Sequence, residues 1–288
     1  MDTYTIYGDL ACREVIALTT TLVAKGLEFT VVEEAASLSF ALATRSGQDH
    51  GPYLRTPEGF VLSGLHAMLD WLERLHPEPA LLPTTPVRRT CARLLEDWIE
   101  LWLPLWPRRS WATLERLGRH LDSAGFLLGS EPWRPDWLLA AWLEGDVLVH
   151  DHARAHLDRQ APRLVELGHD LLHVDLRRTP AVDDAIPISL LPVLGELAQD
   201  YHAYLEGNQR ALKDDADQVT LDLGLGRRVL PVRRGCEQRR IEIGCELALL
   251  DRFVRRDVSR VLDPVGAWHA LRLPPAIEAS DPSDPRSL

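Results

Sequence analysis

Residues 50–73 constrain the fold of this 288-residue chain more than any other segment. They read HGPYLRTPEGFVLSGLHAMLDWLE, in which two short apolar runs flank the turn sequence Thr56-Pro57-Glu58-Gly59. These turn residues predict a hairpin of two strands, at residues 53–55 and 60–62. Leucine and methionine at helical spacing then predict a helix that ends near His76.

The residues before this hairpin alternate between strand and helix signals. Residues 4–7 and 27–34 are rich in β-branched and aromatic side chains, which favours strands. Helix patterns follow at 12–25 and 36–45. A helix that connects two strands favours a parallel pair. The order βαβαββα predicts an α/β thioredoxin-like domain over residues 1–77.

The rest of the chain has a different pattern. Residues 78–86 belong to a stretch with four prolines within 77–86, which is typical of a linker. Helix patterns over 87–175 predict an all-α domain. A helical extension with a β-hairpin is expected over 176–273, and residues 274–288, rich in proline, serine and aspartate, predict a disordered tail.

The extension carries two local features. The hairpin has Gly224 and Gly226 at its expected turn. These glycines lack the third glycine and the preceding parallel strand of a dinucleotide-binding motif. The pattern after the hairpin predicts one long helix over about 236–262.

Charge and cysteine content exclude several classes of function. The formal net charge is −11, which argues against binding of nucleic acid or of an anionic membrane surface. No apolar run approaches the roughly 18 residues of a membrane span, and no secretory signal is visible. The four cysteines show neither CxxC pairing nor zinc spacing, so a cytoplasmic protein with reduced thiols and no metal is expected.

The combination of these parts resembles the glutathione S-transferase superfamily. The resemblance covers roughly residues 3–175 and rests on five phrases: GPYL at 51–54, LSGLHAMLDWLE at 62–73, LLP at 81–83, GFLLGSEPWRPDWLLAAWL at 125–143 and APRLVEL at 161–167. The extension, with IPISLLPVLGEL and VTLDLGLGRRVLPV, resembles the tail of a long bacterial branch. This resemblance implies glutathione as co-substrate, a small electrophilic or disulfide substrate, and a homodimer.

In that family the proline that opens the third strand follows a cis peptide bond. The resemblance therefore implies a cis bond at Pro52, with the backbone of Gly51 turned toward the cysteinyl part of glutathione. A cis X-Pro bond persists where the fold requires it. The alternative is an ordinary trans proline at the start of a strand.

The resemblance places Cys12 at the catalytic position of the Ser-type and Cys-type classes. A helix N-terminus and the neighbouring Arg13 both favour a thiolate, so a thiol pKa well below ~8.5 is expected. Cys12 would then either form a mixed disulfide with glutathione or hold the glutathione thiolate. Val15 at the position of a second cysteine makes any redox chemistry monothiol. Tyr7 is a weaker alternative for the catalytic hydroxyl.

The next helix departs from the family pattern. Its usual acidic residue and serine, which bind the γ-glutamyl carboxylate, are Gly64 and Leu65 here. Leucine has no donor or acceptor, which leaves the helix N-terminus and Ser63, the expected N-cap. Loss of one hydrogen bond to a charged group weakens binding roughly ten- to a hundredfold.

Two hypotheses therefore stay open. The first is an enzyme that performs glutathione-dependent transfer or thiol transfer with a Cys-type site. The alternative is a catalytically silent binding or scaffold protein that has lost tight glutathione binding.

Three further features are weighed for a structural role, and two of them also for a functional role. Asp136 is assigned a folding role at a helix start. The stripe of Trp98, Trp102 and Trp106 is more typical of a helix core than of a substrate pocket. His152 and His156 have the spacing of a zinc pair; no third ligand is evident, although Asp146 or Asp151 could serve.

Overall fold

The computed structural model describes residues 3–33, 36–48, 50–105, 110–174, 176, 183–222 and 227–277. These residues form two compact units, one drawn from residues 1–82 and 132–180, the other from residues 83–131 and 181–280. The helices expected in one all-α domain are therefore divided between the two units. Trp106, the turn at Gly224 and Gly226, and residues 278–288 of the expected tail lie outside the described residues.

The first unit contains a four-stranded sheet with the strand order β2-β1-β3-β4. Strand β1 is parallel to β2 and antiparallel to β3, and β3 is antiparallel to β4. This is the mixed sheet of the predicted thioredoxin-like domain. The elements in chain order are β1 (Tyr4–Tyr7), α1 (Arg13–Ala24), β2 (Phe29–Val32), α2 (Ala36–Ser46), β3 (Tyr53–Arg55), β4 (Val61–Ser63) and α3 (Leu65–Leu75).

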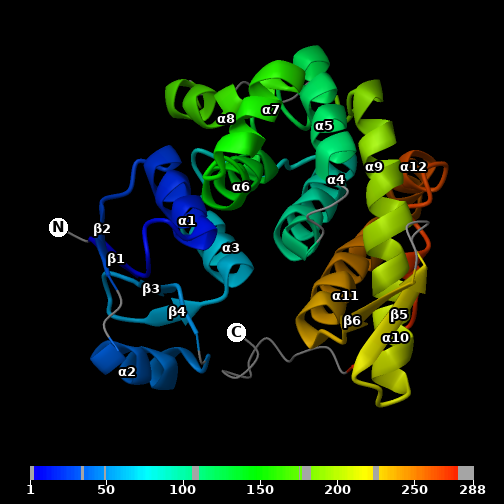
Figure 1. Cartoon of the computed structure of the whole chain (residues 1–288). Helices are drawn as coiled ribbons and strands as arrows, with labels where there is room; N and C mark the ends of the chain where they lie inside the picture. The colour runs from blue at the N-terminus through cyan, green and yellow to red at the C-terminus, as the bar shows by residue number, and fades with distance from the viewer. Residues whose placement is uncertain are drawn as a thin grey trace. The chain divides into compact units, whose positions relative to one another are not determined.

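Helices cover both faces of this sheet. Helices α1 and α3 lie on one face and α2 lies on the other (Figure 1). Ile6 and Leu54 pair across the sheet and are both fully buried. Tyr53 and Val61 point to the opposite face, where they cluster with Leu42 of α2. Alternation along the strands thus gives the sheet two apolar faces.

A second group of helices belongs to the same unit. Helix α6 (Arg134–Trp142) and the π-helical turn η3 (Leu143–Val147) pack against α1. Helix α8 (Pro162–His173) packs on α6 and η3, and α7 (Asp151–Gln160) packs on α8. The Asp136 carboxylate accepts a hydrogen bond of 2.8 Å from the backbone N–H of Trp133, just before α6. Asp136 therefore holds the start of the helix, in keeping with its predicted folding role.

Two ion pairs tie separate segments of this unit together. The guanidinium of Arg134 lies 2.7 Å from the carboxylate of Asp70 on α3, and Arg134 is 1 % exposed. The ammonium of Lys25, at the end of α1, lies 2.8 Å from a carboxylate oxygen of Glu73. It also donates to the carbonyls of His76 and Pro79. These contacts give a buried lysine a full set of acceptors.

We expect Lys25→Met to destabilise the protein, because it leaves the partly buried Glu73 carboxylate without its cation. Removal of one partner of a buried ion pair costs about 3–5 kcal/mol of unfolding free energy. Urea denaturation followed by circular dichroism measures this loss. Lys213→Met is the matched control, since Lys213 is the other lysine of the chain and is exposed. Equal stability of the two variants would contradict the role of Lys25.

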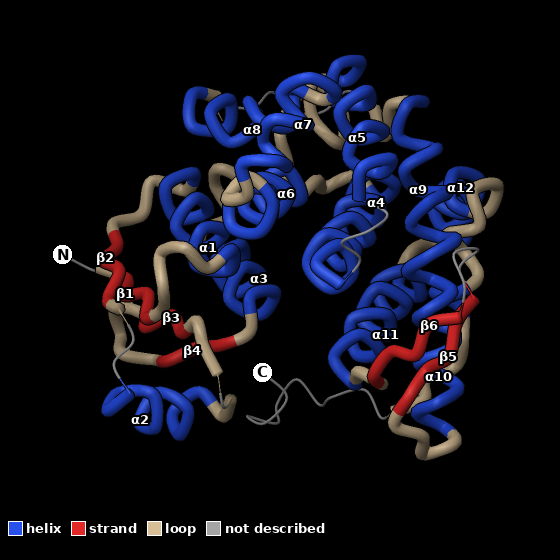
Figure 2. The backbone as a smooth tube through the Cα atoms, viewed as in Figure 1, coloured by secondary structure: helices blue, strands red, loops and turns tan. Residues whose placement is uncertain are grey.

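The second unit is mostly helical (Figure 2). Its elements are α4 (Pro86–Asp97), η1 (Trp98–Trp102), η2 (Leu103–Leu105), α5 (Ser110–Ala124), η4 (Ile188–Leu190), α9 (Leu191–Leu197), η5 (Ala198–His202), α10 (Ala203–Lys213), β5 (Gln218–Asp222), β6 (Arg227–Pro231), α11 (Arg234–Leu249), α12 (Arg252–Leu262) and η6 (Ala270–Arg272). Strands β5 and β6 form the predicted antiparallel hairpin.

The two described tryptophans of the predicted stripe lie in the core of this unit. Trp98 and Trp102 are 2 % and 1 % exposed. The ring of Trp102 lies 5.9 Å from that of Tyr201 and 5.4 Å from that of Tyr204, centroid to centroid. Such aromatic contacts stabilise a helical core, so these two residues do not line a substrate pocket.

The prediction of one helix over 236–262 was wrong. Two helices occupy this region, α11 and α12, and Leu250 between them is extended, with φ −69° and ψ 145°. The carboxylate of Asp251 accepts a hydrogen bond from the backbone N–H of Phe253 and so starts α12. The helical spacing of apolar residues continues across this break, but aspartate is a preferred N-cap residue and a new helix begins after it. Among the described helices, none is long and apolar enough to cross a membrane.

Candidate functional site

The register of three strands brings the candidate residues to one edge of the sheet. Tyr7 at the end of β1 pairs with Tyr53 at the start of β3, and Tyr53 pairs with Ser63 at the end of β4. The residues just beyond this row are therefore neighbours: Gly8 follows β1, and Gly64 follows β4. The chain enters β3 at the same edge, through Gly51 and Pro52.

The peptide bond between Gly51 and Pro52 is cis, as the resemblance implied. Pro52 lies directly against the loop that leads to Cys12. A Cβ atom on Gly8 would lie 3.2 Å from Cβ of Pro52 and 2.7 Å from Cγ2 of Val15. Only glycine fits between the proline and helix α1 without displacing one of them.

The start of α3 lies at the same edge, and its geometry corrects one prediction. Gly64, and not Ser63, is the N-cap residue, with φ 79° and ψ 113°. Glycine adopts this positive φ at little cost. Leu65 is the first helical residue and is buried. As the helix begins there, its first N–H groups have no intrahelical acceptor and point to this edge.

Ser63 ends β4 and has a buried, unsatisfied hydroxyl. Its side chain is 4 % exposed, and within the described part of the chain its Oγ atom has no hydrogen-bond partner. A buried hydroxyl without a partner costs free energy. A ligand that supplied an acceptor or donor here would recover that cost.

Cys12 is the N-cap residue of α1, as predicted, but its thiol is held by a carboxylate. The Sγ atom donates a hydrogen bond of 2.6 Å to Oε2 of Glu14. Burial, followed by this hydrogen bond and the negative charge of Glu14, raises the thiol pKa above its usual value. The backbone N–H groups of Glu14 and Val15 act in the opposite direction but do not prevail. The expectation of a lowered thiol pKa was therefore wrong.

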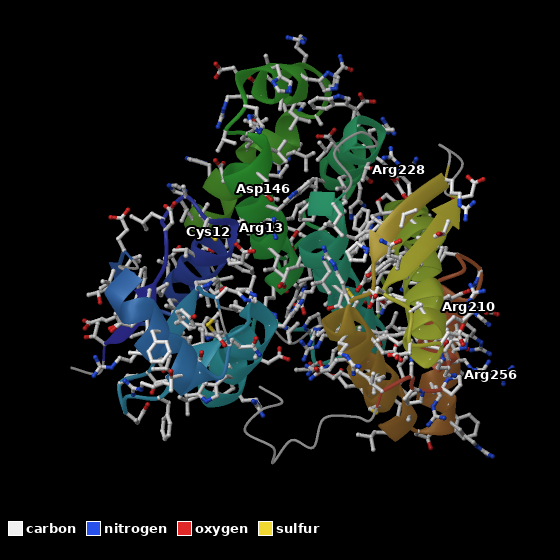
Figure 3. All side chains as sticks on the ribbon, turned by 60° about the horizontal axis from the view of Figure 1, so that its bottom comes forward. Cys12, Arg13, Asp146, Arg210, Arg228 and Arg256 are labelled. Carbon is white, nitrogen blue, oxygen red and sulfur yellow. The ribbon has the colours of Figure 1, made fainter. Side chains whose placement is uncertain are left out.

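Arg13 does not stabilise a thiolate because it is engaged by two carboxylates. Its guanidinium lies 2.6 Å from Asp146 and 3.1 Å from Glu14. Figure 3 shows Asp146 close to Arg13 and Cys12. Asp146 comes from η3, which packs so tightly on α1 that a Cβ on Gly145 would lie 2.9 Å from Cβ of Arg13.

Tyr7 lies on the other side of the sheet from α1. It is partly buried and packs against the cluster of Leu42, Tyr53 and Val61, toward α2. This placement fits the reading of Tyr7 as an ordinary strand aromatic better than a catalytic one.

Sequence reasoning missed Glu14 and Asp146. The first had a signal, since a glutamate two residues after a helix-capping cysteine can reach its thiol. Asp146 had none, because it lies 133 residues from Arg13 in the chain. For His152 and His156, the described residues contain no group of three His, Cys, Asp or Glu side chains that could hold a metal ion.

We predict that Glu14→Gln lowers the pKa of the Cys12 thiol, since it removes the charge that disfavours the thiolate. The pH dependence of alkylation by iodoacetamide measures this pKa. A Cys245→Ser background is needed because Cys245 is exposed, whereas burial raises the pKa of Cys91 and Cys236 to about 12. Glu28→Gln, at an exposed glutamate, is the control. An unchanged or higher pKa in Glu14→Gln would refute the assignment.

Solved structures share this fold at low sequence identity. A Tau-class glutathione S-transferase from mango, Mangifera indica, matches 60 % of this chain and 90 % of its own, with 15 % identity and a TM-score of 0.51. A glutathione S-transferase from Methylobacterium radiotolerans, in complex with glutathione sulfonate, matches 64 % of this chain and all of its own, with 19 % identity and a TM-score of 0.45.

A third similar structure is maleylacetoacetate isomerase from Anaeromyxobacter dehalogenans with bound glutathione. It matches 61 % of this chain and 93 % of its own, with 23 % identity and a TM-score of 0.41. No protein-family model matches the chain, and no curated protein matches it. The strand order and the cis proline are those of the predicted thioredoxin-like domain, and the mango structure shares the fold. The chain therefore has the glutathione S-transferase fold, with a thioredoxin-like N-terminal part and a helical C-terminal part.

Proposed function

We propose that this chain binds glutathione at the sheet edge formed by Gly8, Gly51, Pro52 and the start of α3, and transfers it to a small electrophile. The observation that carries this proposal is the close packing of Pro52 and Val15 on either side of Gly8, which brings the segment of Gly51 and Pro52 against the loop to Cys12. In our proposal the backbone of Gly51 faces the ligand there. Two of the similar structures contain glutathione or glutathione sulfonate, and in our proposal this chain takes the same ligand.

The cysteinyl and the γ-glutamyl parts of glutathione each have a counterpart at this edge. The backbone N–H and C=O of Gly51 pair with the cysteinyl unit as a further strand would. The γ-glutamyl carboxylate accepts hydrogen bonds from the free N–H groups at the start of α3, where the helix dipole favours negative charge. The hydroxyl of Ser63 lies one residue before the N-cap and has no partner among the described residues. It supplies an additional donor.

The thiol of Cys12 fits one of its two expected roles better than the other. Mixed-disulfide chemistry needs a thiolate, and the raised pKa of Cys12 keeps the group protonated near neutral pH. A protonated thiol can donate a hydrogen bond to the sulfur of glutathione while that sulfur attacks the substrate. We therefore favour conjugation to an electrophile over thiol transfer to a disulfide.

A gain-of-binding variant tests the ligand assignment. Leu65→Ser restores the hydroxyl that the family carries at this position, and we expect glutathione to bind roughly ten- to a hundredfold more tightly. Isothermal titration calorimetry measures the change. Leu75→Ser, at the exposed end of the same helix, is the control. If glutathione gives no binding heat with either the native chain or a folded Leu65→Ser variant, the proposal fails.

Substitution of Cys12 distinguishes the two chemistries. If the thiol only donates a hydrogen bond, Cys12→Ser retains most of the conjugation rate and Cys12→Ala loses more. If Cys12 forms a mixed disulfide, both variants lose thiol-transfer activity completely, since neither side chain can form the bond. Assays with an aryl halide and with a glutathione mixed disulfide measure the two activities side by side.

The second candidate function is a silent binding or scaffold protein. Leu65 in place of serine favours this alternative, because leucine offers no hydrogen bond to the γ-glutamyl carboxylate of glutathione. The Glu14 carboxylate beside the Cys12 thiol favours it as well, because it disfavours a thiolate. Retention of the fold without activity is common. Absence of both activities, together with absence of glutathione binding, supports this alternative. By resemblance we also propose that this is a cytoplasmic bacterial protein and that it forms a homodimer. Analytical ultracentrifugation tests the homodimer.

A further inference from the structure

The second unit contains a serine and a histidine that share a hydrogen bond and that the proposed function does not use. The Oγ atom of Ser189, in η4, lies 2.9 Å from Nδ1 of His120, on α5. The other ring nitrogen of His120, Nε2, lies 2.9 Å from the carbonyl oxygen of Leu127. Three separate segments of the chain therefore meet at one imidazole ring.

The partner of Nε2 fixes the direction of both hydrogen bonds. A carbonyl oxygen only accepts, so Nε2 of His120 carries a proton. Burial lowers the pKa of His120 below its usual value, although the bond to Leu127 acts in the opposite direction. The ring is therefore neutral near pH 7 and has a single N–H. It follows that Nδ1 accepts and that the hydroxyl of Ser189 donates. A nucleophile, a base and a group that orients the base are thus in contact.

The two side chains differ in exposure. His120 is 2 % exposed, so its ring is fixed and shielded from water. Ser189 is only partly buried and follows Ile188, which is 84 % exposed. A substrate therefore reaches the hydroxyl from the surface while the base stays inside the protein.

A groove of about 420 Å³ ends one helical turn from this pair. The contact of Arg116 with Glu196 and that of His120 with Ser189 show that α5 runs antiparallel to the facing segment. Arg116 lies four residues before His120, and Pro192 lies three residues after Ser189, about one turn in each case. The described lining of the groove is Ala112, Arg116, Pro192, Gly195, Glu196 and Gln199.

Arg116 brings a positive charge to the end of the groove that is nearer to Ser189. Its Nε atom donates a hydrogen bond of 2.8 Å to one carboxylate oxygen of Glu196, and the hydroxyl of Thr113 donates to the other. This pairing orients the guanidinium, whose terminal N–H groups can donate to a further oxygen. Donors of this kind stabilise the negative oxygen that forms when a carbonyl is attacked.

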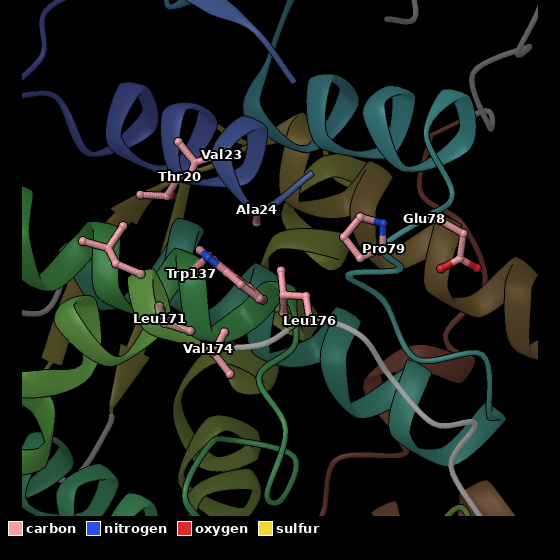
Figure 4. A pocket seen from close by; sticks show the side chains of 10 residues that line it. Thr20, Val23, Ala24, Glu78, Pro79, Trp137, Leu171, Val174 and Leu176 are labelled. Carbon is pink, nitrogen blue, oxygen red and sulfur yellow. The ribbon is translucent and has the colours of Figure 1, made fainter. Parts of the chain in front are cut away.

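A larger cavity, of about 690 Å³, lies in the first unit and carries no comparable pair (Figure 4). Trp137 and Leu171 line it, together with other residues that are mostly apolar. Its described lining includes no histidine, cysteine or serine, and the hydroxyl of Thr20 donates to the carbonyl of Ile16. That cavity offers no nucleophile with a base beside it, in contrast to the groove on α5.

We propose that Ser189 and His120 form a second active centre, which hydrolyses small uncharged carboxylic esters without glutathione. A groove of this volume suits a small molecule. Arg116 and Glu196 are the only charged residues of its described lining, and together they leave it without net charge. A substrate of no net charge therefore enters at no electrostatic cost.

The reaction proceeds in two halves. The Oγ atom of Ser189 attacks the carbonyl carbon of the ester while the hydroxyl proton passes to Nδ1 of His120. The tetrahedral intermediate expels the alkoxide, which takes that proton and leaves as an alcohol. Water then attacks the acyl group on Ser189 and gives a proton to His120, which returns it to Oγ as the carboxylic acid leaves. The Leu127 carbonyl stabilises the imidazolium less than a carboxylate does, so turnover is slow.

Ester hydrolysis by the full-length protein tests the role of Ser189. We expect Ser189→Ala to lower the hydrolysis of p-nitrophenyl butyrate at least about tenfold, without added glutathione. Ser259→Ala is the control, since the hydroxyl of Ser259 on α12 donates to the carbonyl of Arg256 and not to an imidazole. All cysteines are present in both variants, so the difference reports on the serine alone. Equal hydrolysis by the native protein and by Ser189→Ala would overturn the proposal.

Covalent labelling identifies the nucleophile directly. An alkyl fluorophosphonate should form one adduct, which peptide mass spectrometry places on Ser189 and which is absent from Ser189→Ala. The labelling rate should fall toward acid pH with a midpoint below ~6.5, because the base must be neutral and burial lowers the pKa of His120. A hydrogen bond with a structural role alone gives no adduct. Absence of an adduct on Ser189, or labelling elsewhere only, would refute the assignment.

Two glycines provide a matched pair of variants for the groove. A Cβ atom on Gly195, in the lining, or on Gly235, on α11, would meet nothing within 4 Å, so both positions accept a side chain. We expect Gly195→Leu to raise the KM for the ester about tenfold and to leave kcat unchanged, because it narrows the groove beside an intact serine and histidine. Gly235→Leu should change neither value. An unchanged KM in Gly195→Leu would contradict substrate binding in the groove.

Discussion

The close approach at Gly8 holds the candidate glutathione site together. Pro52 lies on one side of this residue and Val15 of α1 on the other, with no room for a side chain between them. The pairing of Tyr7 with Tyr53 and of Tyr53 with Ser63 fixes this approach, because it aligns the ends of three segments in one row. The cis bond at Pro52, the loop to Cys12 and the start of α3 all depend on that alignment.

Local electrostatics at Cys12 differ from what a helix N-terminus alone provides. A helix dipole and free N–H groups stabilise a nearby negative charge by typically 0.3–1 kcal/mol, up to about 2 kcal/mol in partly buried sites. A carboxylate in direct hydrogen-bond contact, together with burial, opposes this and raises the thiol pKa. Arg13, which favours a thiolate when only neighbours in sequence are considered, is engaged by Glu14 and Asp146. The thiol is thereby suited to donating a hydrogen bond, and less so to nucleophilic attack.

The predictions that held depend on turn residues and on a family pattern. Those that failed depend on side-chain contacts: a helix cap, a carboxylate two residues away, or a partner distant in sequence. The strand Tyr53–Arg55 and the cis bond at Pro52 follow from turn residues and from a family pattern within a few residues. At the break before α12 the side chain of Asp251 accepts a hydrogen bond from the backbone N–H of Phe253, and Arg255 donates to the carbonyls of Ala248 and Leu250. An apolar periodicity does not register such contacts. The Arg13–Asp146 pair joins residues far apart in the chain, and only folding reveals it. The same holds for the packing of α6 on α1, which places residues 132–180 in the first unit.

In the proposed function this edge of the sheet binds a peptide-like ligand, with a protonated thiol beside it. The most direct measurement is the electron density of crystals soaked with millimolar glutathione. The account predicts density for the cysteinyl unit alongside the backbone of Gly51, with the γ-glutamyl carboxylate at the first N–H groups of α3. Density for glutathione elsewhere on the protein, or an empty edge at saturating ligand, would contradict it.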